Sequence, residues 1–306
     1  MKHINRVLIT GVAGFIGSNL LDHIMEHTPW KVTGVDDLST GSLDNIAHHL
    51  NDPRVIFAEQ SLFDLGSLRA YDVVFHLAAL PRIQPSYKLI NEHIKANLMG
   101  AMHLVELMVA EEYFPRLVNS SSSAVYGTPD KTPTSEMDAV DCLSPYAFQK
   151  YETEKYLEIL AERYPLDYVN LRYFNPYGPR SYNPENKFSA YSSVVGIFLY
   201  NHKMGKKLQI TGDGLQKRDF IHVHDVAHAN VLAAQHEGKL NTAINVGHSS
   251  TLSILDLAKK ISDDYEFIDK REGEAEITYA DITKAREVLG WEPRRTLDEF
   301  IKSELS

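Results

Sequence analysis

The chain has 306 residues, of which 43% are hydrophobic, and its 31 basic and 41 acidic side chains give a formal net charge of −10. That balance argues against a nucleic-acid binder, which needs surplus Lys and Arg, and against a polybasic protein of the membrane surface. No apolar run approaches the roughly 20 residues of a membrane span. The single cysteine, Cys142, cannot form an internal disulfide and suits a reducing compartment. We therefore expect a globular cytoplasmic protein without nucleic-acid or membrane partners.

Strands and helices alternate through the first half of the chain. Short apolar runs predict buried strands at 6–10, 31–36, 55–58, 73–77, 116–121 and 168–172. Helical spacing of apolar residues predicts helices at 15–27, 87–110 and 145–163. Such alternation is typical of βαβ units with a parallel sheet. We therefore predict an α/β fold with a Rossmann-type doubly wound parallel sheet.

The alternation loosens beyond residue 173. Residues 175–187 are rich in Pro, Gly, Asn and Tyr, which indicates a functional loop. Later elements are expected as a helix at 189–200, short strands near Leu208 and Phe220, and helices near Asp225 and Leu252. We predict a dinucleotide-binding domain at 1–172 and, at 173–306, mainly a smaller C-terminal substrate-binding lobe, with some segments returning to the sheet.

Three glycines mark the turn between the first strand and the first helix. Gly11, Gly14 and Gly17 have the spacing GxxGxxG, which lets the backbone approach a pyrophosphate at the helix N-terminus. Asp36 ends the second strand about 20 residues on, where a carboxylate accepts hydrogen bonds from an adenosine ribose. The same carboxylate would repel the 2′-phosphate of NADP. The combination predicts NAD as the cofactor.

A tyrosine and a lysine four residues apart share one face of a predicted helix. Tyr146 and Lys150 follow a Ser-Pro dipeptide that resembles an N-cap and first helical position, which places the pair at a helix start. Bringing a tyrosine pKa from near 10 to neutrality takes about 4 kcal/mol, which a lysine and a cationic nicotinamide could supply. Tyr151 and Lys155 repeat the spacing, but five residues rotate a helix by roughly 140°. We favour the first pair and interpret Tyr151, beside two glutamates, as part of an exposed face.

Four serines, at positions 120–123, end the fifth predicted strand. Ligands bind at the carboxyl ends of parallel strands, so a hydroxyl there can hydrogen-bond the oxygen that is oxidised. A serine run by itself also suits a plain polar turn.

Together these residues resemble the extended short-chain dehydrogenase/reductases that act on nucleotide sugars, most closely the UDP-glucose 4-epimerases and related UDP-hexose 4-epimerases. The similarity covers nearly the whole chain. Beyond the glycine turn, Asp36 and the Tyr146–Lys150 pair, it rests on His76-Leu77-Ala78-Ala79, Asn97, Ser-Ser-Ala-Val-Tyr-Gly at 122–127, Arg172-Tyr-Phe-Asn175, Gly212-Asp-Gly214, Arg218-Asp-Phe-Ile-His222, Arg271-Glu-Gly273 and Leu289-Gly-Trp-Glu-Pro293.

The resemblance implies an NAD-dependent epimerase that inverts C4 of a nucleotide sugar. Tyr146 would take the proton of the 4-hydroxyl, and a hydride would pass to NAD and return to the other face of a transient 4-keto sugar. Lys150 would bind the nicotinamide ribose and lower the pKa of the tyrosine. The catalytic hydroxyl falls on Ser122, four residues before the tyrosine of the Val-Tyr-Gly motif, with Ser123 as the alternative.

The same resemblance implies the ligand contacts. Those to the cofactor fall on Gly11, Gly14, Phe15, Ile16, Gly17, Asp36, Asp37, Asp64, Leu65, Leu77, Ala78, Ala79, Asn97, Tyr146, Lys150 and Tyr173. Those to the sugar nucleotide fall on Ser122, Asn175, Arg218, Arg271 and Glu274. Asp64 and Leu65 would lie at the adenine, and the arginines suit a diphosphate because guanidinium groups pair bidentately with phosphate oxygens.

Two positions narrow the reaction that the resemblance implies, and two others leave the substrate open. Ser123 and Ala124 stand where sugar-nucleotide 4,6-dehydratases carry Asp-Glu, which favours oxidation and return at C4 over elimination. Thr211 replaces an aromatic residue that often stacks on uracil, so the nucleotide stays open. Thr278 stands where some epimerases carry a tyrosine that excludes N-acetyl groups, so UDP-N-acetylhexosamines stay open as substrates.

Alternatives remain at this point. A UDP-uronate 4-epimerase needs a cationic group near C6, for which Arg82 and Arg180 are candidates. A non-catalytic NAD-binding regulator would lack the catalytic residues. The pathway, galactose use or polysaccharide synthesis, is open. His222 and His224 could suggest a metal pair, but the resemblance makes this segment a strand-to-helix junction, and we predict no metal site.

The resemblance also implies a homodimer. The helices expected at 87–110 and 145–163 resemble those that form a four-helix interface in this family. Leu98, Met102, Val105 and Met108 would then form the contact stripe, unless they face the sheet.

Overall fold

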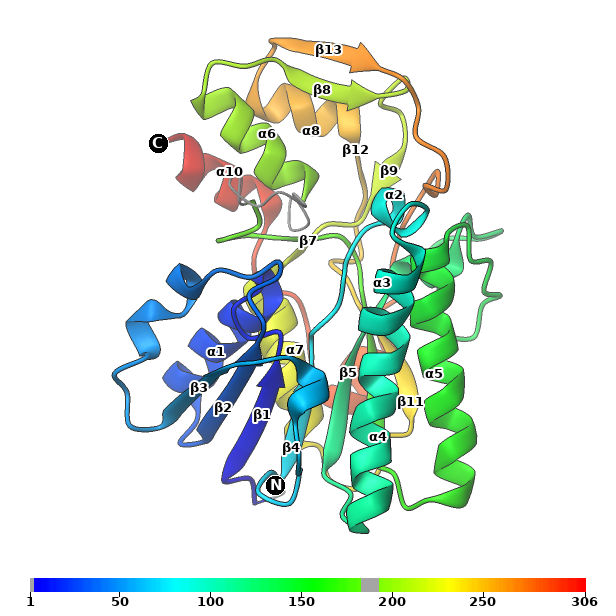
Figure 1. Ribbon diagram of the computed structural model, residues 1–306. Helices are drawn as coiled ribbons and strands as arrows, with labels where there is room; N and C mark the ends of the chain where they lie inside the picture. Colours follow the sequence, from blue (N-terminus) through cyan, green and yellow to red (C-terminus); the bar gives the residue numbers. More distant parts are fainter. Residues whose placement is uncertain (1–2, 183–192) are drawn as a thin grey trace.

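The computed structural model describes residues 3–182 and 193–306. Its centre is a seven-stranded sheet in the order β11-β6-β5-β4-β1-β2-β3, and all of the pairings are parallel (Figure 1). The strands are β1 (Arg6–Thr10), β2 (Lys31–Asp36), β3 (Val55–Glu59), β4 (Val73–His76), β5 (Arg116–Ser122), β6 (Tyr168–Tyr173) and β11 (Thr242–Val246). This arrangement confirms the predicted Rossmann-type fold.

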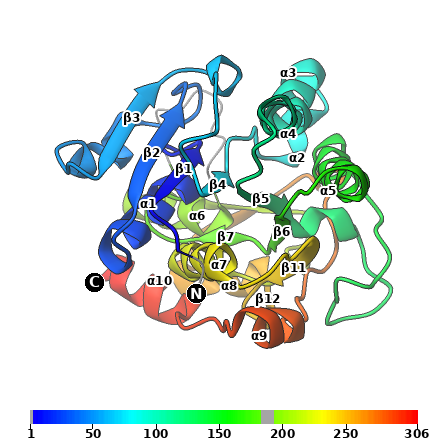
Figure 2. The same cartoon turned by 90° about the horizontal axis from the view of Figure 1, so that it is seen from below.

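Helices cover both faces of the sheet, which explains why its central strands β1, β4 and β5 are buried along almost their whole length. One face carries α1 (Phe15–His27), α7 (Val223–Gln235) and α9 (Thr283–Leu289), and the other carries α4 (Gly100–Glu111) and α5 (Pro145–Arg163), as Figure 2 shows from below. In β1, Val7, Leu8 and Ile9 have no exposed surface. The alternate side chains of β1 therefore pack into two separate cores, one on each side.

The long helix expected at 87–110 is interrupted. The structure has α2 (Ile83–Ser86), α3 (Ile90–Ile94), a π-helical turn at Lys95–Met99, and then α4. A π-helical turn holds one more residue than an α-turn and so changes which side chains face inward. Asn97 lies in that turn and points inward, where its amide exchanges two hydrogen bonds with the backbone of Leu80, at 2.8 and 3.0 Å.

The predicted dimer stripe is partly wrong. Val105 and Met108 are 3% and 0% exposed and pack in the core against the sheet, which is the alternative left open above. Leu98 and Met102 are half-buried. The side chains that α3, α5 and the π-helical turn expose are different ones, namely Ile90, Ile94, Met99, Phe148, Tyr156 and Ile159.

A smaller lobe lies above the carboxyl ends of the strands (Figure 1). It holds α6 (Val194–Lys203), α8 (Ile254–Ile261) and α10 (Leu297–Leu305) around their own apolar core, beneath the parallel pair β8 (Leu208–Thr211) and β13 (Tyr265–Ile268). Two short pairs, β7 (Pro176–Tyr177) with β10 (Ile221–His222) and β9 (Lys217–Arg218) with β12 (Leu252–Ser253), complete it. Of the helix expected at 189–200, residues 189–192 lie outside the described part.

The chain passes between the sheet and the lobe more than once. After β6 it enters the lobe, comes back through α7 and β11, and enters the lobe again before α9 returns to the sheet. The carboxyl ends of β1, β4, β5 and β6 therefore face segments from both halves. Within the described residues no helix combines the length and the apolar character that crossing a bilayer requires.

Candidate active site

A cavity of about 1120 Å³ lies between the carboxyl ends of the strands and the lobe. The predicted residues that line it are Gly11, Gly14, Phe15, Ile16, Gly17, Asp36, Asp37, Leu77, Ala78, Ala79, Ser122, Tyr146, Lys150, Tyr173, Asn175, Arg218, Arg271 and Glu274. The structure thus brings the glycine turn, the Tyr–Lys pair and the arginines to one space. Asp64, Leu65 and Asn97 are the predicted residues that it leaves outside.

The glycine turn fits a dinucleotide because two of its positions have no room for a side chain. Gly11 has φ +72°, and a Cβ there would lie 2.7 Å from the backbone nitrogen of Ala78. A Cβ on Gly17 would lie 2.1 Å from the carbonyl oxygen of Gly11. The turn therefore packs directly on the first turn of α1, whose N-terminal backbone N–H groups have no acidic side chain beside them. This arrangement is suited to a pyrophosphate.

Asp36 is fixed beside this turn. Its Oδ2 accepts a hydrogen bond from the backbone N–H of Ala13 at 2.9 Å, and its Oδ1 accepts one from Leu38 at 2.9 Å. Burial raises the pKa of Asp36, and the two backbone donors oppose that effect. Each carboxylate oxygen keeps a free lone pair, which leaves acceptor sites for two ribose hydroxyls.

Two of the three predicted catalytic groups, Ser122 and Tyr146, lie in hydrogen-bond contact. The hydroxyl of Ser122 bonds with that of Tyr146, and Ser122 also accepts from the backbone N–H of Ala124 at 3.2 Å. Lys150 donates from Nζ to the carbonyl oxygen of Ser120 at 2.8 Å. Ser144 caps the helix by accepting from the N–H of Ala147, which places Tyr146 and Lys150 in the first turns of α5. The contact with Tyr146 favours Ser122 over Ser123 as the catalytic hydroxyl.

Burial opposes the charged forms of both groups in the cofactor-free site. It raises the pKa of Tyr146, which the Ser122 hydrogen bond partly offsets. It lowers the pKa of Lys150 to about 8, while the charge of Glu154 opposes that change. A neutral tyrosine beside a lysine of lowered pKa becomes more acidic when positive charge is added to the cavity.

Glu154 corrects the interpretation of the surrounding helix face. It is 4% exposed, and its carboxylate pairs with Arg172 on β6, with Nε–Oε1 at 2.9 Å and Nη2–Oε2 at 2.5 Å. Ser121 donates to it at 2.5 Å. Tyr151, expected on an exposed face, is half-buried against the core. The pair Tyr151 and Lys155 lies outside the cavity.

The two residues predicted to contact adenine lie outside the cavity. Asp64 is exposed outside the cavity and Leu65 is buried in the core, whereas Ser61, Leu62 and Phe63 line the cavity. Ser61 caps this turn by accepting a hydrogen bond from the backbone N–H of Phe63, which places residues 61–63 rather than Asp64 at the cavity. Asn97 lies behind the cavity wall, where it donates to Gln149 at 2.9 Å and is hydrogen-bonded to the backbone of Leu80.

Basic side chains gather in the lobe half of the cavity. Arg218 is 9% exposed, and its guanidinium lies 3.6 Å from the carboxylate of Glu274. Arg82 also lines the cavity, and burial together with the charge of Arg271 lowers its pKa to about 10. Arg180 lies outside it and binds Asp22 and the carbonyl oxygen of Asn45 instead. Of the two cations considered for a uronate, only Arg82 thus faces this space.

Two threonines of the cavity wall accept hydrogen bonds from neighbouring side chains. The hydroxyl of Thr278 accepts from the side-chain amide of Asn175 at 2.9 Å and from the backbone N–H of Asp219 at 3.0 Å. Gln216 donates to both oxygens of Thr211 at 3.0 Å. Thr211 and Thr278 both line the cavity.

A model of the NAD-dependent epimerase/dehydratase family matches residues 7–247. The chain belongs to that family. A UDP-glucose 4-epimerase of Mycolicibacterium smegmatis is 35% identical over 307 residues, with 97% of this chain and 96% of the relative covered. These findings confirm the predicted family, the enzyme class and NAD as the cofactor.

Solved structures agree. UDP-N-acetylglucosamine 4-epimerase from Methanobrevibacter ruminantium, in complex with UDP-N-acetylmuramic acid, matches with a TM-score of 0.89 and 32% identity over 100% of this chain and 98% of that one. UDP-glucuronic acid 4-epimerase from Bacillus cereus, in complex with UDP-glucuronic acid and NAD, matches with a TM-score of 0.89 and 29% identity over 98% and 97%. The relatives therefore share a fold and differ in the sugar they are named for.

Proposed function

We propose that this protein inverts C4 of a UDP-hexose, either the UDP-glucose/UDP-galactose pair or the corresponding N-acetylhexosamine pair. The observation that carries the proposal is the contact between the hydroxyls of Ser122 and Tyr146, with Lys150 one helical turn away, in the same cavity as the glycine turn. Bound NAD supplies a hydride acceptor and donor at this place.

The chain's own residues move the proton. Ser122 holds the sugar hydroxyl by a hydrogen bond, and Tyr146 takes its proton at the phenolic oxygen and later returns it. Lys150 acts through its ammonium group, whose charge favours the phenolate. Asn97 and Ser144 hold the surrounding backbone in place. General acid–base catalysis of this kind contributes a rate factor of roughly 10² to 10⁴.

Elimination of water is disfavoured by the two residues that come directly after the catalytic serine. A dehydratase needs an acid there, whereas Ser123 is neutral and Ala124 has no functional group. The acidic side chains that line the cavity are Asp36, Asp37, Glu92 and Glu274, and none of them comes from this stretch. A sugar oxidised at C4 is therefore reduced again rather than dehydrated.

The diphosphate and the sugar would bind in the half of the cavity that the lobe lines. We assign Arg218, Arg271 and Asn175 to the diphosphate and Glu274 to the nucleoside ribose. We assign the adenine contacts to Ser61 and Leu62, which line the cavity, in place of Asp64 and Leu65, which do not. The small side chain of Thr278 supports acceptance of N-acetyl groups, and Arg82 supports the alternative of a uronate.

Product analysis tests the proposal directly. NAD-supplemented protein is incubated separately with UDP-galactose, UDP-N-acetylgalactosamine and UDP-glucuronate, and the products are separated by chromatography. We expect the C4 epimer of at least one of the first two. Turnover of UDP-glucuronate alone would establish the alternative, and no epimer from any of them with NAD bound would overturn the proposed activity.

We also propose a homodimer in the cytoplasm, joined through the exposed apolar side chains of α3 and α5. Phe148 and Ile159 are 55% and 62% exposed on α5. Light scattering should give twice the chain mass for the wild type and a monomer for Phe148→Glu with Ile159→Glu. Wild-type protein of single-chain mass would contradict this assembly.

A further inference from the structure

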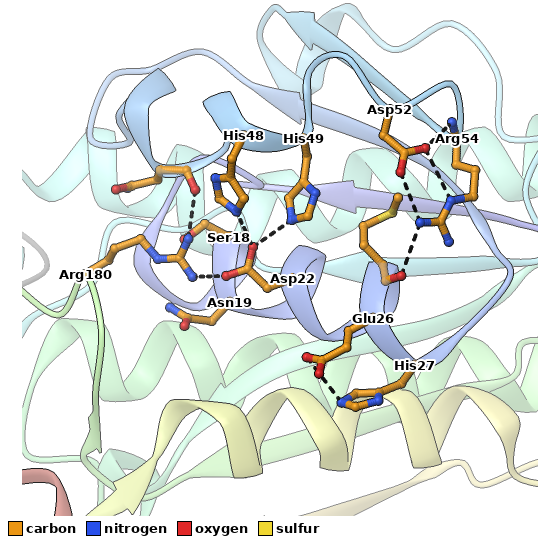
Figure 3. Close-up of polar contacts among 12 residues, drawn as sticks. Ser18, Asn19, Asp22, Glu26, His27, His48, His49, Asp52, Arg54 and Arg180 are labelled. Atoms are coloured by element: carbon orange, nitrogen blue, oxygen red, sulfur yellow. Dashed lines mark hydrogen bonds and ion pairs between the residues drawn. The ribbon is translucent and has the colours of Figure 1, made fainter.

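Outside the cavity, an aspartate and two histidines meet beside α1. Asp22 lies on the helix, and His48 and His49 lie in the short helical turn Ala47–His49 that follows β2. The Nε2 atoms of both imidazoles are 2.8 Å from the same oxygen, Asp22 Oδ1 (Figure 3). None of the three side chains lines the cavity.

A fourth side chain holds the carboxylate in this orientation. Arg180, in the segment after β7, binds the other oxygen of Asp22 and donates to the carbonyl oxygen of Asn45 at 2.8 Å. Asn19, one turn before Asp22, donates to the carbonyl oxygen of Pro179 at 3.1 Å. Asp22 Oδ1 is therefore left aimed between the two histidines, as Figure 3 shows.

We propose that Asp22, His48 and His49 form a binding site for a divalent transition-metal cation of the zinc type. Two imidazole nitrogens and one carboxylate oxygen are a ligand set that zinc prefers, with an open fourth position for water. The Arg180 guanidinium on Oδ2 is the kind of outer partner that orients a ligating carboxylate. Among the described residues, Asp22, His48 and His49 are the His, Cys, Asp or Glu side chains that gather as a group of three or more with all their ligand atoms within 4.8 Å of one another.

The distances allow an ion with small movements. Ligand atoms about 2.0–2.1 Å from a tetrahedral zinc lie roughly 3.3 Å apart, so the two contacts to Oδ1 need to lengthen by about 0.5 Å. The His48 side chain is 52% exposed and the Asp22 side chain 30%, which leaves room for this shift and a path from solvent. His49, at 17%, is the more fixed ligand. Nε2 of each imidazole binds the metal without its proton, which passes to solvent, and Nδ1 carries the proton of the neutral ring.

The site would join three separate parts of the chain. Asp22 is on α1, whose N-terminus faces the cavity, the histidines follow the strand that ends at Asp36, and Arg180 belongs to the segment that leads into the lobe. An ion that binds only the folded chain stabilises it by mass action. Zinc should therefore raise the melting temperature without competing with NAD.

Direct titration tests the site. Full-length NAD-loaded protein is stripped with a chelator and titrated at constant pH with ZnCl₂ by calorimetry, with MgCl₂ in parallel, and with CoCl₂ by visible absorption. We expect one equivalent of zinc, no saturable magnesium, a cobalt d–d band and a higher melting temperature with zinc. His48→Gln and Asp22→Asn should each lose at least about tenfold in zinc affinity.

His27→Gln is the matched control, because His27 is a histidine at the end of α1 that is 50% exposed and lies 3.6 Å from the carboxylate of Glu26. It should bind zinc as the wild type does. Retained NAD content in His48→Gln shows that its fold is intact. Wild-type protein that takes up no zinc, or a His48→Gln variant with unchanged affinity, would overturn the proposal.

Discussion

The cavity has one wall from the sheet and one from the C-terminal lobe, and the two walls hold their groups by different means. On the sheet wall, backbone geometry fixes the positions of the groups. Gly11 and Gly17 have no space for a Cβ, and two backbone N–H groups hold the carboxylate of Asp36. On the lobe wall the groups are side chains of short strands and loops, such as Arg218 and Thr278. The sheet wall, to which we assign the cofactor, therefore depends on backbone positions, whereas the lobe wall, to which we assign the sugar nucleotide, can change by single substitutions.

Tyr146→Phe tests the place where the two walls meet. The variant keeps the ring and loses the group that moves the proton, so kcat should fall by about 10³. NAD affinity should stay within a factor of about two, since no cofactor-binding turn changes. Tyr151→Phe is the control, because its phenol lies outside the cavity, and it should be as active as the wild type. Equal losses in both variants would assign the effect to the helix rather than to the proton.

Gly17→Ala tests the rigidity of the sheet wall. The new Cβ would lie 2.1 Å from the carbonyl oxygen of Gly11, so the glycine turn must open. NAD affinity measured by fluorescence should fall about a hundredfold, which corresponds to roughly 2.8 kcal/mol. Gly66→Ala is the control, because nothing lies within 4 Å of its Cβ position. Unchanged NAD binding in Gly17→Ala would show that this wall is pliable.

Lys150→Met tests the cost of placing a charge at this wall. Burial lowers the pKa of Lys150 from 10.5 in the unfolded chain to about 8 in the folded one. The unfolded chain therefore binds the proton of this lysine more tightly. The free energy of unfolding of the wild type consequently rises between pH 8 and pH 10.5, where the folded protein has released this proton and the unfolded chain has not. The inactive variant should be more stable at pH 7 by about 2 kcal/mol, after allowing for the lost bond to Ser120. Its advantage in urea unfolding should shrink toward pH 10. A variant less stable than the wild type at pH 7 would contradict this account.

Thr278→Tyr tests the adaptability of the lobe wall. Added bulk at the sugar end should lower kcat/KM for UDP-N-acetylgalactosamine relative to UDP-galactose by about tenfold. Thr278→Val removes the hydrogen bonds to Asn175 and Asp219 without the bulk, so it separates the two effects. Equal turnover of the acetylated and plain substrates by Thr278→Tyr would count against a role in selection.

The limits of prediction from the sequence fall along the same division. The glycine turn, Asp36 and the Tyr146–Lys150 pair stand at element ends that glycine, proline and capping residues mark in the sequence. Asp64 and Leu65 lie outside the cavity, because the sequence of this turn does not show which of its side chains point toward the carboxyl ends of the strands. The sequence offers Arg82 only as one of two candidate cations for a uronate, because nothing in it shows that the Arg82 side chain is buried and lines the cavity.

The sequence also does not show which side chains far apart in the chain are buried together in the fold. Glu154 stands next to Lys155 in a charged stretch and is expected at the surface, yet it is buried with Arg172 from a strand on another part of the chain. The resemblance to the family places Val105 and Met108 at a dimer interface, but both are buried against the sheet, and the sequence of the helix does not show which of its sides meets the sheet. Asp22, His48 and His49 are separated by 26 and 27 positions and come together only in the fold.

The pairing of β6 with β11 has a consequence for synthesis. β6 ends at Tyr173 and its outer partner begins at Thr242, so the ribosome must make α6, β8 and α7 before this edge of the sheet is covered. At ordinary translation rates the interval lasts roughly 4 to 15 seconds. Throughout it the nascent chain presents an open, apolar strand edge, which is a template for pairing with a neighbouring copy. Chaperone capture during translation should therefore concentrate between these two strands.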